Sequence, residues 1–186
     1  MKTTAAAPAD YSRTARIFHW VTAVAFLVQF PIGFTMTQLT PGSTSELLFS
    51  VHGSVGFFVL WLALLRLAYR LRTKINRRNS ILATWHSRAT LIAHWTIYSL
   101  LILVPLTGWA GSVAGDILEL FGIVRLPAIL PPDHTWSIWL LWSHGLLAFS
   151  LMAIVAVHIG FGLQGYLEGS AEEPESPTPS GVPASS

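Results

Sequence analysis

Four histidines lie within apolar segments of this chain, and their spacing suggests that they bind metal. His144 and His158 are fourteen residues apart in one segment, while His19 and His52 lie in two others. In a helix, fourteen residues make almost four turns, so the two side chains share a face about 21 Å apart along the axis. Ionisable residues inside apolar spans generally mark functional sites, and neutral imidazole is a common metal ligand. The pattern predicts two metal centres or metal cofactors stacked along one helix.

The segments that carry these histidines are long enough to cross a membrane. Hydrophobic residues make up 52% of the chain and charged residues 11%, and four stretches can each span about 30 Å of hydrocarbon. Helices are expected over residues 17–37, 47–69, 89–111 and 137–166. Only Arg66 is charged within them, and we interpret it as a side chain that extends to the membrane interface. The fold class is therefore all-α, a membrane-embedded four-helix up-down bundle.

The remaining segments contain too few apolar residues to add a second domain. Residues 1–12 are expected to be mobile, and residues 168–186, rich in Pro, Ser and Glu, to be a disordered tail. Between them, residues 13–167 form one transmembrane domain. The connection between the third and fourth spans mixes acidic with apolar residues over 116–130, which predicts a short helix lying on the membrane surface.

The cations define an orientation. Ten of the eleven Lys and Arg residues precede the first span or surround the connection between the second and third. Because cytoplasmic loops carry an excess of Lys and Arg, both regions and both termini are predicted to be cytoplasmic. The Arg-rich connection is expected to contact anionic lipid, and no nucleic acid is expected as a partner.

With this orientation the four histidines pair by depth. His19 and His158 lie near the inner face, and His52 and His144 lie near the outer face. Each pair could bind one haem iron from opposite sides, so the bundle is predicted to bind two haems. Glycines near the histidines are expected to let a flat macrocycle or a neighbouring helix approach closely; they are Gly53, Gly56, Gly145, Gly160 and Gly162.

The absence of cysteine narrows the cofactor. It excludes covalent c-type haem, iron–sulfur clusters and thiolate-bound haem, which leaves two non-covalent haem b groups. Met36 and Met152 are placed less well than the histidines as ligands. An iron with two histidine ligands has no open position for oxygen, which favours electron transfer.

Further residues are candidates for contacts near the inner pair. Arginines there could neutralise the haem propionates; they are Arg13, Arg16, Arg70 and Arg72. His94 and Tyr98 lie one turn apart and could exchange protons with a quinone. His94 could also contact the haem edge, replace His19 as axial ligand, or be a packed histidine that hydrogen-bonds across the bundle.

Four short motifs carry a family resemblance. They are Arg16-Ile17-Phe18-His19-Trp20, then Val51-His52-Gly53-Ser54-Val55-Gly56 with Arg66-Leu67, then His94-Trp95-Thr96-Ile97-Tyr98 with Pro105-Leu106-Thr107-Gly108-Trp109, and finally Trp142-Ser143-His144 with His158. Over residues 13–166 the chain resembles the prokaryotic cytochrome b561 family. The resemblance implies a four-helix di-haem b protein of the bacterial inner membrane, with axial ligands at the four histidines. Members exchange electrons between ubiquinone or ubiquinol and partners, and one branch oxidises superoxide at the outer face.

The predicted function is transmembrane electron transfer linked to the quinone pool, with ubiquinone as a substrate and an outer-face redox partner left open. Superoxide oxidation is an alternative, although Glu46, Asp116, Glu119 and Asp133 against Arg125 give the outer segments a formal charge of −3, which repels an anion. Another alternative is a cytochrome subunit of a larger oxidoreductase, as in Ni,Fe-hydrogenase. From other classes, an intramembrane histidine metal transporter and a purely structural bundle stay open, although a transport site is expected at the midplane. The oligomeric state is not predicted.

Overall fold

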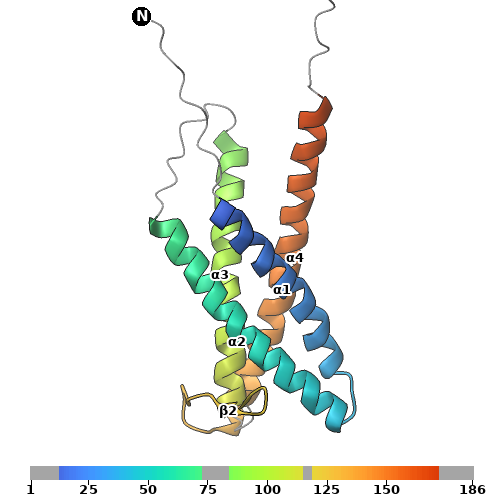
Figure 1. Cartoon of the computed structure of the whole chain (residues 1–186), viewed down its shortest axis with the longest axis vertical. Coiled ribbons are helices and arrows are strands. Elements are labelled where there is room, and N and C mark those ends of the chain that lie inside the picture. Colours follow the sequence, from blue (N-terminus) through green and yellow to red (C-terminus); the bar gives the residue numbers. More distant parts are fainter. Residues whose placement is uncertain (1–12, 73–83, 115–118, 172–186) are drawn as a thin grey trace, which may run out of the picture.

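The computed structural model describes residues 13–72, 84–114 and 119–171, which form four helices and a small hairpin. The helices are α1 (Arg13–Met36), α2 (Ser43–Arg72), α3 (Thr84–Ala114) and α4 (His134–Ala171). Successive helices run in opposite directions (Figure 1), and all four are long and apolar enough to cross a membrane. The prediction of an all-α, membrane-type four-helix bundle is confirmed.

The helices start three to five residues before the predicted spans. At the start of α4, Asp133 Oδ1 accepts hydrogen bonds from the backbone N–H groups of Thr135 (2.8 Å) and Trp136 (3.1 Å). An aspartate at this position satisfies amide groups that have no partner within the helix. α4 also continues to Ala171, past the predicted end of the domain at residue 167. The predicted mobile segment 1–12 and the tail from residue 172 lie outside the described residues.

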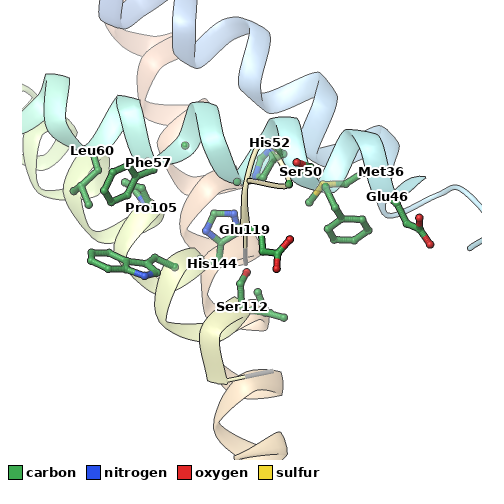
Figure 2. Close-up of a pocket in the computed structure, with 17 residues that line it drawn as sticks. Met36, Glu46, Ser50, His52, Phe57, Leu60, Pro105, Ser112, Glu119 and His144 are labelled. Atoms are coloured by element: carbon green, nitrogen blue, oxygen red, sulfur yellow. The ribbon is translucent and has the colours of Figure 1, made fainter. Parts of the chain in front are cut away.

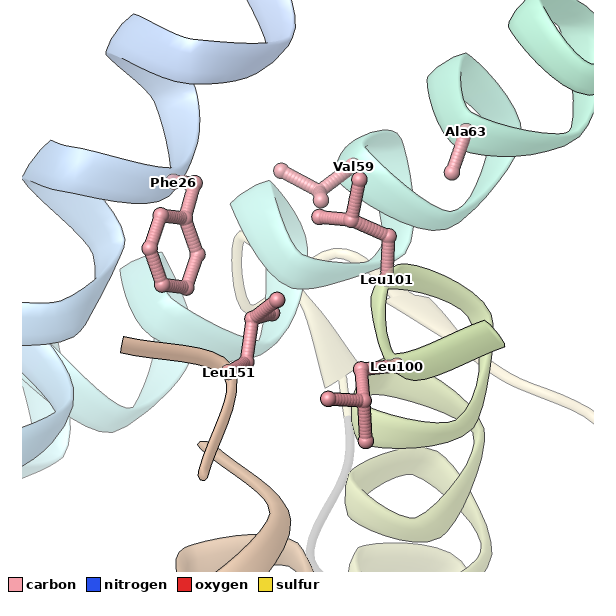
Figure 3. Close-up of a cluster of buried hydrophobic side chains, with 6 residues drawn as sticks. All are labelled: Phe26, Val59, Ala63, Leu100, Leu101 and Leu151. Carbon is pink, nitrogen blue, oxygen red and sulfur yellow. The ribbon is translucent and has the colours of Figure 1, made fainter. Parts of the chain in front are cut away.

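The helices pack in the order α1–α2, α2–α3 and α3–α4. A hydrophobic core fills the middle of the bundle and joins all four helices (Figure 3); it comprises Phe26, Val59, Ala63, Leu100, Leu101 and Leu151. Leu151 lies seven residues from both His144 and His158, so this core separates the two ends of the bundle that carry the histidines. Most other large apolar side chains face outward, as expected where the surrounding solvent is lipid.

The connection from α3 to α4 contains a β-hairpin. Strand β1 (Glu119–Leu120) pairs antiparallel with β2 (Val124–Arg125), and the amide of Ile123 donates to the carbonyl of Leu120 at 2.9 Å. The predicted surface helix over 116–130 is therefore wrong for residues 119–125, and residues 116–118 lie outside the described residues. Phe121 and Gly122 have φ angles of 49° and 69°, which suit a tight hairpin turn and not a helix.

A tertiary contact holds the hairpin against α2. The amide of Phe121 donates to Ser54 Oγ at 2.7 Å, and Ser54 Oγ itself donates to the carbonyl of Ser50. Phe121 also lies near Phe58, with ring centroids 6.5 Å apart. These contacts place Glu119 and Gly122 against the end of the bundle that contains His52 and His144.

Candidate functional site

The bundle brings the histidines together in two pairs, one at each end. His52 of α2 and His144 of α4 have ring centroids 5.9 Å apart, with ring planes at 88°. At the other end, His19 of α1 and His158 of α4 have centroids 6.5 Å apart at 72°. The depth argument from the sequence therefore paired the residues that the tertiary structure brings into proximity.

These distances can be compared with the requirement for binding one metal ion. Two imidazoles on opposite sides of a metal, each with a metal–nitrogen bond of about 2 Å, have ring centroids roughly 6 Å apart. Both pairs match this spacing. His94 of α3 has its centroid 5.1 Å from that of His158, which is shorter than the spacing for ligation across an iron. His19 therefore fits the opposite ligand of His158 better than His94 does.

At the His52–His144 site, each imidazole lies against a glycine of a neighbouring helix. A Cβ on Gly108 would lie 2.8 Å from His144 Nδ1, and a Cβ on Gly33 would lie 2.6 Å from His52 Cε1. Neither glycine was singled out from the sequence. A Cβ on Gly145, Gly160 or Gly162 would meet nothing within 4 Å among the described residues, so the expectation that they let a neighbouring helix approach is wrong. Their approach to a flat macrocycle stays a prediction.

A backbone carbonyl orients one of these rings. His144 Nδ1 lies 2.8 Å from the carbonyl oxygen of Val104. Because a carbonyl only accepts hydrogen bonds, Nδ1 carries the proton and Nε2 keeps its lone pair for a metal. This is the usual arrangement of a histidine ligand, with the second ring nitrogen bonded to a carbonyl.

The cavity at this site has a volume of about 330 Å³ and lies between α2, α3, α4 and the hairpin (Figure 2). Its lining includes the carboxylates of Glu46 and Glu119, and among the described residues no Lys or Arg lines it. Trp109, also in the lining, has a buried Nε1 with no hydrogen-bond partner among the described residues. The sequence placed Trp109 in a family motif but did not predict that its indole lines the cavity, because that depends on how α3 is rotated.

The cavity at the His19–His158 site is larger, about 600 Å³, and its lining is basic and aromatic. It is lined by Ala15, Phe18, His19, Arg66, Tyr69, Arg70, Leu71, His94, Trp95, Tyr98 and His158. Tyr98 is only 5% exposed. The guanidinium groups of Arg66 and Arg70 each lie 5.2 Å from the centroid of the Tyr98 ring. His94 and Tyr98 thus border the same cavity as the histidine pair.

Arg66 differs from its sequence-based interpretation. Its guanidinium points into the bundle and lies 3.0 Å from His19 Nδ1, so the expectation that it extends to the interface is wrong. The position of a charged residue inside a span was the sequence signal for this role, since such residues usually belong to a functional site. Of the four arginines expected beside the propionates, Arg70 lines this cavity, whereas Arg13, Arg16 and Arg72 are exposed and are not part of its lining.

No group of three or more His, Asp or Glu side chains within residues 13–72, 84–114 and 119–171 is arranged to hold a metal ion by itself. At one end His52 and His144 form a two-residue clamp, and at the other His19 and His94 both lie beside His158, with centroids 6.5 Å and 5.1 Å from it. Each end has an adjoining cavity. Two opposed imidazoles beside a cavity suit a metal that brings its other ligands with it, as the porphyrin of a haem does.

Comparison with known proteins agrees with this geometry. A search of curated proteins gave no match. The sequence model of the prokaryotic cytochrome b561 family matches residues 10–165. Because this match begins just before α1 and ends within α4, it includes all four helices and both histidine pairs, and the chain belongs to the prokaryotic cytochrome b561 family.

Proposed function

We propose that this chain is an integral membrane di-haem b cytochrome that carries electrons across the bacterial inner membrane in exchange with the quinone pool. Membership of the cytochrome b561 family implies haem b. The observation that carries the proposal of two haems is the pair of histidine clamps at opposite ends of the bundle, with centroid distances of 5.9 Å and 6.5 Å.

The residues have defined roles in this proposal. His52 and His144 hold one haem, His19 and His158 hold the other, and the Val104 carbonyl keeps the His144 proton on Nδ1. A bound haem b supplies reversible one-electron redox chemistry. A haem held by two histidines would keep no coordination position open, which favours electron transfer over reaction with oxygen.

The proposed orientation follows from the arginines. Arg66, Arg70 and Arg72 lie at the end of α2 near the His19–His158 site, and the positive-inside rule assigns that end to the cytoplasm. We therefore call His19–His158 the inner site and His52–His144 the outer site. Arg70, together with Arg66, is placed to neutralise the carboxylates of an inner haem.

Quinone is proposed to react at the inner site. His94 can take or give a proton at the cavity, and Tyr98 adds a hydroxyl one turn away. The outer cavity favours quinone-linked transfer over superoxide oxidation, because no Lys or Arg among the described residues lines it to attract a small anion. Glu46 lies in the lining, and the nearby Arg125 is already paired with Glu119 at 3.1 Å.

The number of haems tests the proposal. A pyridine haemochrome assay on the purified protein should give two haems b per polypeptide, and a reduced-minus-oxidised spectrum should show low-spin b-type bands. One haem or none per chain would contradict it.

A further inference from the structure

Gln29 is a buried polar residue in the middle of α1, next to the outer site. Its side chain is 9% exposed, and its Nε2 donates a hydrogen bond to the backbone carbonyl of His52 on α2. Its Oε1 is buried and has no hydrogen-bond partner in the part of the chain that the structure describes. Burying an amide in an apolar environment costs free energy unless the amide is hydrogen-bonded. The contact with His52 must therefore offset the free-energy cost of burying the Gln29 side chain.

The contact between Gln29 and His52 is reciprocal. The Gln29 amide crosses α2 at Gly56, where an added Cβ would lie 3.2 Å from Gln29 Nε2. The His52 ring crosses α1 at Gly33, where an added Cβ would lie 3.0 Å from His52 Nδ1. Gly56 lies one turn after His52, and Gly33 lies one turn after Gln29. Each polar side chain therefore passes over a glycine of the other helix, and that of Gln29 bonds to the backbone one turn before the glycine.

The two ends of this contact differ in how completely they are bonded. Gln29 Nε2 reaches the His52 carbonyl, whereas His52 Nδ1 is buried beside Gly33 and has no hydrogen-bond partner among the described residues. A small sliding or rotation of α1 against α2 would decide whether Nδ1 gains a backbone acceptor on α1. The Gln29 amide limits such movement, because it ties α1 to the residue that carries the imidazole.

We propose that Gln29 is a positioning residue for His52, an inference that rests on the proposed role of His52 as axial ligand of the outer haem. Gln29 holds α1 and α2 in the register that keeps the His52 ring over Gly33, with its centroid 5.9 Å from that of His144. Gln29 thereby orients His52 through the backbone of α2, whereas Val104 orients His144 through ring Nδ1; both are supports of the kind that ligand histidines use.

The test uses the purified protein with both haems bound. Gln29→Leu keeps the approximate volume and removes the amide. The outer haem should then transfer to excess apomyoglobin about tenfold faster, as expected when the support of a ligand histidine is lost. The low-spin ferric EPR signal of the outer haem should shift, while the transfer rate and signal of the inner haem stay unchanged.

Three further variants make the test specific. Gln29→Glu is expected to restore the wild-type rate and signal, because a neutral carboxylic acid in an apolar environment can still donate to the His52 carbonyl. Gly56→Ala keeps Gln29 but displaces its amide, so it should reproduce the Gln29→Leu signature. Thr22→Val is the matched control, because Thr22 is also a buried polar residue of α1 but its hydroxyl bonds to Phe18 of its own helix.

The outcomes separate this inference from the proposed function. An unchanged outer haem in Gln29→Leu, or equal weakening of both haems, would overturn the positioning role. If Gln29→Leu does not fold, Gly56→Ala decides by the same two criteria. If His52→Ala retains both haems, the proposed role of His52 as a ligand is rejected. If His52→Ala loses one haem while Gln29→Leu is unaffected, only the role of Gln29 is rejected.

Discussion

Each end of the bundle contains a pair of imidazoles, but the cavities beside the two pairs differ in size and in the charge of their lining. The outer cavity is small, about 330 Å³, with Glu46 and Glu119 in its lining. The inner cavity, about 600 Å³, is lined by Arg66, Arg70 and the additional histidine His94. The ligand pairs can therefore be equivalent while the electrostatic potential around them is not. If each end holds a haem, as proposed, such a difference would separate the two redox potentials and favour a different partner at each end.

The most direct test of the difference between the two ends is to remove one proposed ligand from each site. His144 and His158 both lie on α4 and can be replaced one at a time. His144→Ala should abolish binding of the outer haem and His158→Ala that of the inner haem, because each loses one of two axial ligands. A pyridine haemochrome assay should fall to about half in both variants, and a redox titration should lose a different transition in each. Loss of the same transition in both would show that the two histidines serve one cofactor.

A second change tests whether the glycine under an outer histidine is required. Gly108→Ala places a Cβ 2.8 Å from His144 Nδ1 and 3.0 Å from Cε1, so the ring or α3 must move. The outer haem should be largely lost while the inner haem is retained, as measured by the visible spectrum of the purified protein.

The control is Gly160→Ala, two residues from His158. Its added Cβ meets nothing within 4 Å among the residues that the structure describes, and alanine in place of glycine stabilises a helix by up to about 1 kcal/mol. Both haems should remain. Wild-type outer haem in Gly108→Ala would show that the glycine contact does not position His144.

A third experiment asks whether the additional histidine gives the inner site its proton chemistry. His94→Phe should slow quinol-driven haem reduction by about a hundredfold, the lower range for loss of a general acid or base. Stopped-flow absorbance on protein that retains both haems measures this rate. His94→Gln, which keeps hydrogen bonding without titrating, separates proton transfer from packing. An unchanged rate in His94→Phe would remove His94 from the quinone reaction.

The smallest expected effect concerns the arginines. The inner haem should have the higher midpoint potential, because positive charge nearby favours the added electron. Arg66→Gln should lower that potential by tens of millivolts, where about 59 mV corresponds to a tenfold change in the ratio of reduced to oxidised haem. A spectroelectrochemical titration measures it. Arg72→Gln, which changes an exposed residue, is the control, and equal shifts in both variants would show that cavity placement is irrelevant.

Much of the site was readable from the sequence because a bilayer restricts the possible structures. A span must be helical so that its backbone groups are bonded internally, and consecutive spans must alternate in direction. His19, His52, His144 and His158 therefore had predictable depths once the four apolar stretches were recognised. The order of the motifs along the chain then favoured the family that the comparison with known proteins showed.

Other features depended on contacts between distant segments. The hairpin over 119–125 needed the positive φ angles at Phe121 and Gly122 and the bond to Ser54, whereas the composition of that segment favoured an interfacial helix. Because Arg66 lies close to the end of its span, it was expected to extend to the membrane interface. Its actual direction follows from the proximity of His19 and Tyr98.

The sequence by itself determined the four spans, their alternation and the depth of each histidine, because length, hydropathy and helical rise fix position along the membrane normal. The tertiary structure alone decided position within the membrane plane. Helix rotation and crossing determine which side chain meets which backbone, and they depend on close contacts such as those of Gln29 with Gly56 and His52 with Gly33. Such contacts are set by packing across helices, which has no periodicity along a single chain segment.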